Sequence, residues 1–470
     1  MREGYNKMMF KRSRRPEKVE FDKKKFYLNV FSLVIPMALQ NLINVGVLAS
    51  DVFMLGKVGE KALSGASLGG QIYYIMGLFL FGLTSGTTVL TAQYWGKGDT
   101  KTIEKVLALG MKAAVSVTAI FMFLSVIFPG TLLRIFTNDP EVVSEGIRYL
   151  RIVGLSFVIT GITQTYLYVM RSVERVMIST IVFSISLVCN VFLNAIFIFG
   201  LFGLPKMGVV GAALGTFIAR TLEIVMVFIY ARTRNKEIKF RMKYFMKCDP
   251  ILVKDFLTYS LPVVLNEVLW GFATSANTAI LGHMGSAAVA ANSVAQVARQ
   301  LATVVAFGVT TATAIYLGKT IGERKNEHAK AYAVRFIVLS IILGIMGGAL
   351  ILVCSPFVIS SLSLTDQAKE YLRFMFFVMS YFVVAQSYNC TLNIGIFRSG
   401  GDTRFGLKTD MCVMWGGSIL FGSIAAFVLK WPVPVVYFIL MCDELIKIPI
   451  LTLRYRKYIW LNNITRDDLS

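Results

Sequence analysis

The stretch Leu55-Gly56-Lys57-Val58-Gly59 returns 226 positions later as Leu281-Gly282-His283-Met284-Gly285. No gap is needed, and the same shift pairs further identical residues: Pro36 with Pro262, Ala62 with Ala288, Ser67 with Ser293 and Gly96 with Gly322. Each copy also contains one carboxylate that its counterpart lacks, Asp51 in the first and Glu267 in the second. A duplicated apolar chain with isolated acids inside it is typical of a secondary transporter.

The composition places this chain in a membrane. Of its 470 residues, 56% are hydrophobic and only 16% are charged, which is too little polar surface for a soluble globular protein. The net charge of +21 does not predict a nucleic-acid partner, because the Lys and Arg residues lie in short connections and in the tails. The six cysteines show no paired spacing and there are only two histidines, so we expect no disulfide framework, metal centre or cofactor.

Twelve apolar segments are each long enough to cross a hydrocarbon core of roughly 30 Å as a helix. They cover approximately residues 27–56, 68–95, 107–128, 148–170, 178–201, 208–231, 256–282, 293–318, 334–358, 371–397, 407–429 and 432–453. We therefore predict an all-α integral membrane protein with twelve transmembrane helices. They form two six-helix lobes that are parallel internal repeats, with a cleft for substrate between them.

The expected organisation follows from the basic residues, which gather on alternate connections and in both tails. The divisions are a basic cytoplasmic tail at 1–26, an N-lobe at 27–231, a cytoplasmic inter-lobe linker at 232–255, a C-lobe at 256–455 and a cytoplasmic tail at 456–470. Arg171 and Arg398 are among the basic residues counted on the cytoplasmic side. The positive-inside rule therefore predicts that both termini face the cytoplasm. We expect a multi-pass protein of the plasma membrane without a cleavable signal peptide.

Three motifs resemble those of the multidrug and toxic compound extrusion (MATE) family. They are Asp51-Val52-Phe53-Met54-Leu55-Gly56, the run from Asn190 to Gly200, and the turn Phe397-Arg398-Ser399-Gly400-Gly401-Asp402-Thr403-Arg404. With the twelve segments and the repeat, the resemblance covers about residues 27–455. It implies export of organic, often cationic, small molecules, driven by inward flow of Na⁺ or H⁺ and without ATP.

The first candidate site is Asp51 in the outer half of segment one. An ionised carboxylate there costs at least about 2.5 kcal/mol on insertion scales, so it is rarely retained without a partner or a role. The resemblance implies that it binds the coupling cation, either as a proton acceptor or as a Na⁺ ligand; the alternative is a hydrated acid near the interface. Asn190 and Asn194, four residues apart on one helix face, could join it or could simply hold helices together.

The second candidate is Glu267, five residues after Pro262. We expect Pro36 and Pro262 to bend their helices and free backbone carbonyls to line a cavity. Glu267 is then either a cation or drug contact, or one half of a structural ion pair with Arg299. A branch of the family has an aspartate in segment ten where this chain has Ser387, so Glu267 would lack that partner.

Polar residues near the two prolines are candidates for the substrate pathway: Gln40, Asn41 and Asn44 in the first lobe, and Asn266, Gln296 and Gln300 in the second. Two further groups look like local ion pairs rather than transport sites. They are Arg220 with Glu223, and a self-neutralised group of Asp443, Glu444 and Lys447 near the cytoplasmic half.

Three functions compete at this point. The first is a cation-coupled exporter, in which cation and drug favour opposite states of the two lobes. The second is a flippase for lipid-linked oligosaccharide or other lipid-like cargo, which should have a more cationic cleft. The third is a membrane enzyme or channel, which no catalytic motif supports. Because the cleft is built within one chain, we expect a monomer in the lipid bilayer.

Overall fold

The computed structural model describes residues 22–247, 249–362 and 364–467, and these are almost entirely helical. Each of the twelve predicted segments falls on a helix or on consecutive helices. Ten helices of the described part are long and apolar enough to span a membrane. The prediction of an all-α membrane protein is confirmed.

The first half contains six long helices and two short ones. They are α2 (Lys23–Gly56), α3 (Glu60–Lys97), α4 (Thr100–Ile127), α5 (Pro129–Arg134), α6 (Pro140–Ser172), α7 (Val176–Phe199), the 3₁₀ turn η1 (Leu201–Gly203) and α8 (Val209–Thr233). The linker carries the short helix α9 (Met242–Met246). Residues 1–21 of the predicted N-terminal tail lie outside the described residues.

The second half begins with long helices and ends with broken ones. It comprises α10 (Pro250–His283), α11 (Ser286–Gly322), α12 (Asn326–Ser361), α13 (Asp366–Cys390), η2 (Thr391–Phe397), α14 (Thr403–Asp410), η3 (Met411–Ile419), α15 (Leu420–Ser423), η4 (Ile424–Val428), α16 (Val433–Leu440) and α17 (Asp443–Arg456). The segments η2, η3 and η4 are wide π-helical turns. Among the described residues, the first half has no such turns.

Aspartates cap several helices just outside the apolar segments. Asp99, Asp139 and Asp249 accept hydrogen bonds from the first backbone amides of α4, α6 and α10. A proline follows Asp139 and Asp249 directly, at a helical position where no backbone donor is needed. Polar end turns of this kind extend the helices beyond the apolar runs, so the helix boundaries lie outside most of the predicted ones.

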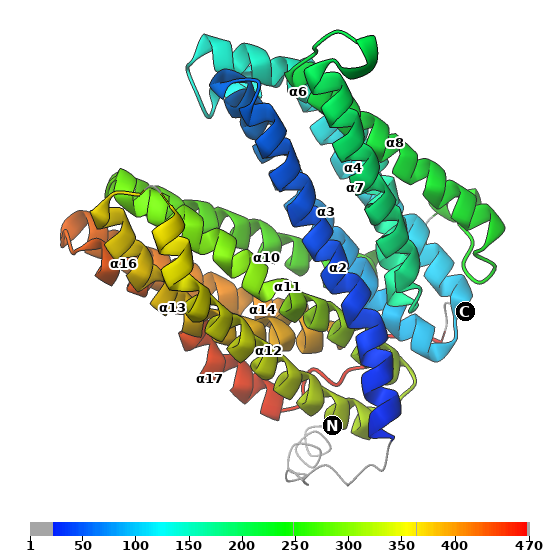
Figure 1. Ribbon diagram of the computed structural model, residues 1–470. Coiled ribbons are helices and arrows are strands. Elements are labelled where there is room, and N and C mark those ends of the chain that lie inside the picture. The colour runs from blue at the N-terminus through cyan, green and yellow to red at the C-terminus, as the bar shows by residue number, and fades with distance from the viewer. Residues whose placement is uncertain (1–21, 248, 363, 468–470) are drawn as a thin grey trace.

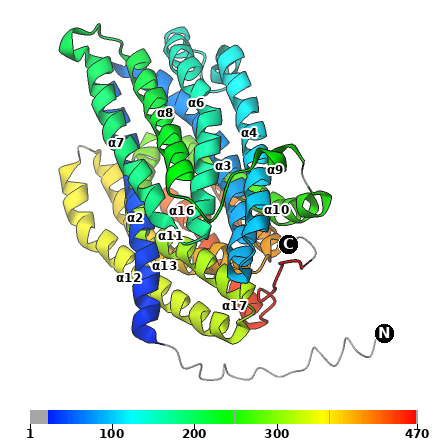
Figure 2. The same cartoon turned by 90° about the vertical axis from the view of Figure 1, so that its right-hand side faces the viewer.

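The two halves form bundles that diverge at one end and meet at the other (Figure 1). Figure 2 shows the same arrangement turned by 90°, with α2 running along both bundles. The N-terminal part of α2 packs on the second half, where Phe26, Val30 and Val34 share a hydrophobic cluster with Val309 and Ala312 of α11. The C-terminal part of α2 contributes Leu55 to a cluster of the first half.

Small residues let the two halves approach closely. A contact made by a residue of the first half is repeated by the residue 226 positions later in the second half. A Cβ atom on Gly96 would lie 2.0 Å from the carbonyl oxygen of Lys319, and one on Gly322 would lie 2.0 Å from that of Gln93. Lys319 is the repeat counterpart of Gln93, just as Gly322 is that of Gly96. The crossing of α3 and α11 is therefore two-fold symmetric, as the parallel repeat predicts.

The C-terminal segment closes the same end of the molecule. Gln93 of α3 is fully buried; its amide donates to the carbonyls of Ser399 (2.7 Å) and Asn462 (3.1 Å), and its oxygen accepts from the amide of Ile464 (2.9 Å). The Arg466 guanidinium donates to Asp255 of α10 at 2.8 Å. The tail thus ties the two bundles together where they meet.

Candidate functional site

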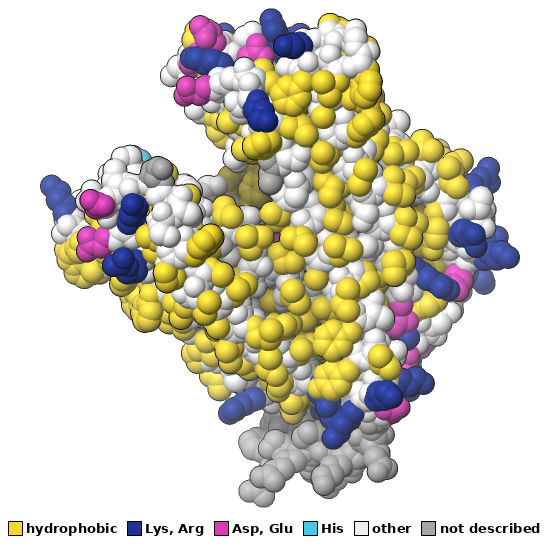
Figure 3. All heavy atoms as spheres, in the orientation of Figure 1, with side chains coloured by type: hydrophobic (Ala, Val, Ile, Leu, Met, Phe, Trp, Pro, Cys, Tyr) yellow, Lys and Arg dark blue, Asp and Glu magenta, His cyan; other side chains and the backbone are white. Residues whose placement is uncertain are grey.

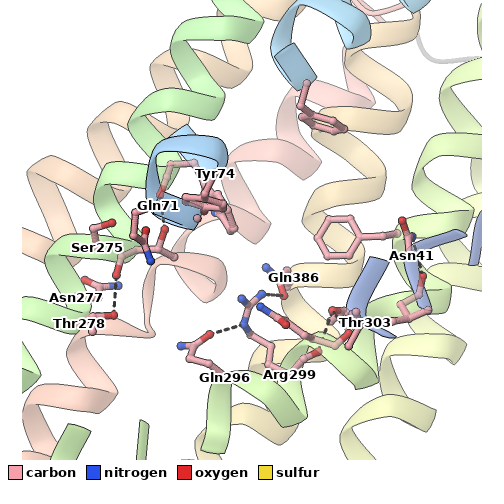
Figure 4. Close-up of a pocket in the computed structure, with 18 of the residues that line it drawn as sticks. Asn41, Gln71, Tyr74, Ser275, Asn277, Thr278, Gln296, Arg299, Thr303 and Gln386 are labelled. Carbon is pink, nitrogen blue, oxygen red and sulfur yellow. Dashed lines mark hydrogen bonds between the residues drawn. The ribbon is translucent and has the colours of Figure 1, made fainter. Parts of the chain in front are cut away.

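A cleft of about 970 Å³ lies between the diverging bundles. Figure 3 shows it as a deep hollow at the end of the molecule opposite the described start of α2. Both halves supply polar side chains to it, and Figure 4 shows several of them facing the cavity. Its polar lining includes Asn41, Asp51, Gln71, Tyr74, Arg171, Asn277, Gln296, Arg299, Gln300, Gln386, Asp443 and Glu444.

Asp51 and the two predicted asparagines meet at the wall of this cleft. The Asn194 amide donates to Asp51 Oδ1 at 2.6 Å and to Asn190 Oδ1 at 3.3 Å, and Asn190 donates to Thr216 at 3.3 Å. Asn194 is fully buried, and its Oδ1 accepts no hydrogen bond from a described residue. The cluster therefore combines one carboxylate with amide oxygens, which are hard ligands suited to a small cation.

A buried ion pair lies on helix α8. Glu223, 1% exposed, accepts from Arg220 at 2.6 Å and from Ser186 at 2.6 Å. The predicted ion pair is confirmed. Since Glu223 already neutralises Arg220, Asp51 does not depend on Arg220 as its salt-bridge partner.

The predicted partner of Glu267 was wrong. Its carboxylate lies 2.7 Å from Arg398, whereas Arg299 donates to Gln296 at 2.8 Å and to Gln386 at 3.2 Å. Arg398 comes from the turn after η2, which folds back against α10, so the contact joins positions 131 residues apart. Glu267 is buried in the second half and is held by a fixed counter-charge.

The predicted pathway residues lie in three different places. Asn41, Gln296 and Gln300 line the cleft. Gln40 does not, because it is buried beside Ser179 and Thr180 and donates to both hydroxyls. Asn44 is exposed and lies outside the cleft lining.

Asn266 lines a second cavity of about 280 Å³ between α3 and the second half, together with Glu267. Both predicted prolines lie within unbroken helices, Pro36 in α2 and Pro262 in α10.

The ion pairs of Lys447 with Asp443 and Glu444 that the spacing predicts are present, but a third carboxylate joins them, so the group is not neutral. The Lys447 ammonium lies 3.0 Å from Asp410, 3.0 Å from Asp443 and 3.2 Å from Glu444. Asp410 comes from α14, so its presence was not visible from spacing within α17. Asp443 and Glu444 line the cleft, and Glu444 also lines the second cavity with Lys447 and Asp410. Three carboxylates thus surround one ammonium between the cleft and the second cavity.

Two cleft arginines were also missed as site residues. Arg171 lies over the Tyr168 ring at 4.5 Å and donates to Ser179 at 3.1 Å, and Arg299 is bound by glutamines. Within the described residues, neither forms a salt bridge. The positive-inside count had assigned Arg171 and Arg398 to an aqueous connection, but they are 9% and 3% exposed. Their burial could have been suspected only from their position at the ends of apolar runs.

Similarity to known proteins identifies the fold and the family. The MatE family model matches the chain twice, over residues 36–196 and 262–424. The chain belongs to the MATE family of transporters. The two matches begin at Pro36 and Pro262, the same pair that opens the internal repeat. The chain is therefore a transporter and not an enzyme.

Similar curated MATE relatives include bacterial proteins named for drug resistance. The probable multidrug resistance protein NorM of Haemophilus ducreyi is 25% identical over 84% of this chain and 86% of its own length. The probable multidrug resistance protein YoeA of Bacillus subtilis is 22% identical over 82% of this chain and 83% of its own length.

Two solved structures show the same fold at 18% identity. A MATE protein in the bent conformation has a TM-score of 0.84, covering 94% of this chain and 99% of that one. A multidrug resistance MATE transporter in the outward-facing conformation has a TM-score of 0.82, covering 92% and 96%.

Proposed function

We propose that this MATE transporter is a secondary active multidrug exporter of the plasma membrane. It exchanges organic, often cationic, small molecules for inward Na⁺ or H⁺ by alternating access of its two lobes. The observation that carries the proposal is the Asp51–Asn194 contact at the wall of a cleft between the lobes. The names of the relatives, which include probable multidrug resistance proteins, support the cargo class.

In this proposal the termini face the cytoplasm and the cleft is open to the outside. Basic side chains at the closed end support that orientation, since cytoplasmic connections carry an excess of Lys and Arg. A cation entering from outside then reaches Asp51 directly from the cleft. Its binding removes negative charge from the wall and favours release of a cationic drug, and the lobes then rock inward. One chain contains the whole pathway, so the protein works as a monomer.

The coupling cation is held by Asp51, Asn190 and Asn194. Na⁺ would use the Asp51 carboxylate and the amide oxygens, including the unpartnered Oδ1 of Asn194. A proton would need only Asp51, with Asn194 keeping its hydrogen bond to the neutral acid. Glu267 is a weaker candidate for binding the coupling cation, because its carboxylate already forms an ion pair with Arg398.

A flippase for lipid-linked oligosaccharide or other lipid-like cargo is the second candidate. Arg171 and Arg299 line the cleft without a salt bridge to any described residue, and guanidinium groups suit phosphate-bearing head groups. Acids line the same cavity, however, and Asp443 and Glu444 would repel such a head group. The mixed charge supports a cationic cargo over an anionic one.

The deciding experiment is efflux of a fluorescent organic cation from proteoliposomes, under an imposed Na⁺ gradient and separately under a pH gradient. We expect one gradient to drive transport, and Asp51→Asn to abolish it. Glu141→Gln, which removes an exposed acid at the outer end of α6, is the matched control and should transport normally. Transport by Asp51→Asn at the normal rate would remove Asp51 from the mechanism. No transport under either gradient would favour lipid-linked cargo.

A further inference from the structure

The root of the C-terminal strap, by which we mean residues 457–467 after α17, is fixed to the second half. Trp460 is fully buried and shares a hydrophobic cluster with Leu317 and Ile321 of α11. Its ring stacks on that of Tyr455 with 5.8 Å between centroids, and its indole N–H donates to the Tyr455 carbonyl at 3.2 Å. Because the strap is also continuous with α17, its root moves with the second half.

The tip of the strap is fixed to α3 of the first half. The Ile464 amide donates to the Gln93 side chain at 2.9 Å, and the Arg466 amide donates to the Tyr94 hydroxyl at 3.2 Å. The Lys97 ammonium donates to the Arg466 carbonyl at 2.6 Å. The Ile464 side chain is 7% exposed and packs in a hydrophobic cluster that consists mainly of residues from α3, α4 and α6. Removing the tip from α3 would therefore expose an apolar side chain and break three hydrogen bonds.

Charged side chains of the tip also reach the second half. The Arg466 guanidinium donates to Asp255 of α10 at 2.8 Å. Asp467 lies 3.0 Å from Lys97 of α3 and 3.5 Å from Arg324 at the end of α11, so one carboxylate bridges cations of both halves. Asp467 and Arg324 are exposed, and such pairs contribute little. If the halves separate at this end, the root and the Asp255 contact keep the tip on the second half, and the contacts with α3 are the ones that break.

We propose that the strap locks the closed end of the molecule, and that it must leave α3 before the lobes can part there. The proposal rests on the alternating access proposed above. The contacts between the strap and α3 exist only while this end is closed, so they favour the state in which the cleft opens at the other end. Weakening them shifts the equilibrium toward the opposite state without altering any residue of the cleft.

The test is the distance between spin labels at Lys101 and Asn326, two exposed positions at the starts of α4 and α12. The labels are placed on the full-length protein with its own cysteines replaced by alanine. In Ile464→Ala we expect the ratio of long to short distances to rise about tenfold or more, because losing a buried isoleucine side chain destabilises only the closed state. Truncation after Leu461, which removes the tip and keeps Trp460, should raise the ratio as well.

Leu461→Ala is the matched control. Leu461 packs against the cluster of the second half that contains Trp460, so its contacts persist when the tip leaves α3. The ratio of distances should equal that of the unmodified protein. An unchanged ratio after truncation, or an equal rise in Leu461→Ala and Ile464→Ala, would overturn the proposal.

A third label shows which half keeps the strap. With a label at Asn462 in Ile464→Ala, the distance to Lys101 should lengthen in the open population while the distance to Asn326 stays the same. The reverse result would overturn the proposal. These distances are measured without cargo or an ion gradient. Failure of gradient-driven efflux would therefore contradict the exporter and leave the strap's predicted distances unchanged.

Discussion

The guanidinium of Arg398 lies 2.7 Å from the Glu267 carboxylate and also donates to Ser85 of the opposite lobe at 3.1 Å. One buried ion pair therefore belongs both to the interior of the second half and to the contact between halves. A loss of transport after substitution of Glu267 alone would not distinguish cation binding from damage to this contact.

Glu267→Gln should destabilise the protein strongly, because Arg398 is 3% exposed and would keep a buried charge without its partner. Breaking such a pair costs about 3–5 kcal/mol. Thermal unfolding in detergent should show a clear fall in the midpoint, with most of it recovered by combining Glu267→Met with Arg398→Met. A single variant as stable as the original would show that the ion pair contributes little.

Gly215→Ala should disturb the Asp51 cluster without changing any polar group. A Cβ atom there would lie 2.1 Å from Asn194 Oδ1, so the amide must move from Asp51. We expect a several-fold fall in gradient-driven efflux, by analogy with the cost of small displacements at binding sites. Gly77→Ala is the control, since a Cβ atom at that position would have open space around it and efflux should be unchanged. Normal efflux by Gly215→Ala would mean that the Asn194 contact is dispensable.

Gly96→Ala and Gly322→Ala should each open the closed end of the molecule. Their Cβ atoms would meet backbone carbonyls at 2.0 Å, which no side-chain movement can relieve. Spin labels placed across the closed end should report longer distances in both variants and in similar proportion, because the two contacts are symmetric. Gly46→Ala, with no atom within 4 Å of its added Cβ, should leave the distances unchanged. A response in only one variant would contradict the symmetry.

Attachment of the C-terminal segment should not depend on pH between about 5 and 8. The hydrogen bond from Lys97, followed by the charges of Lys97 and Arg324, lowers the pKa of Asp467 below its ordinary value of 3.8. A lowered carboxyl pKa contributes stability that is complete above the ordinary value and is lost only as pH falls through the lowered one. A spin label at the exposed residue 462 should therefore keep constant mobility over this range. Release near pH 6 would point to another titrating group.

Sequence patterns were sufficient to predict which residues lie together where those residues share one helix or occupy matching positions of the repeat. Asn190 and Asn194 are a helical turn apart, so their convergence could be predicted, and the repeat aligned Gly96 with Gly322 before their contacts were known. The partners of Glu267 and Lys447 could not be predicted in this way. Arg398 and Asp410 reach them from other helices through tertiary packing, which leaves no periodic signal.

The direction in which a side chain points from its helix explains the remaining differences between the predicted and the observed cleft residues. Gln40 and Asn41 are neighbours in sequence, but successive residues on a helix point about 100° apart. Asn41 therefore faces the cleft while Gln40 binds Ser179 and Thr180 of α7. Polarity alone could identify both as unusual in an apolar helix, but not which of them faces substrate.

The symmetric crossing of α3 and α11 has an evolutionary consequence. Its contacts are isologous: Gly96 meets Lys319 as Gly322 meets Gln93, and Gly318 lies against Ala92, its own repeat counterpart. Two identical six-helix chains would make this same interface as a homodimer. Fusion of two such genes would preserve the contact while leaving each copy free to diverge, and the carboxylates Asp51 and Glu267, each present in one half only, lie outside this conserved contact.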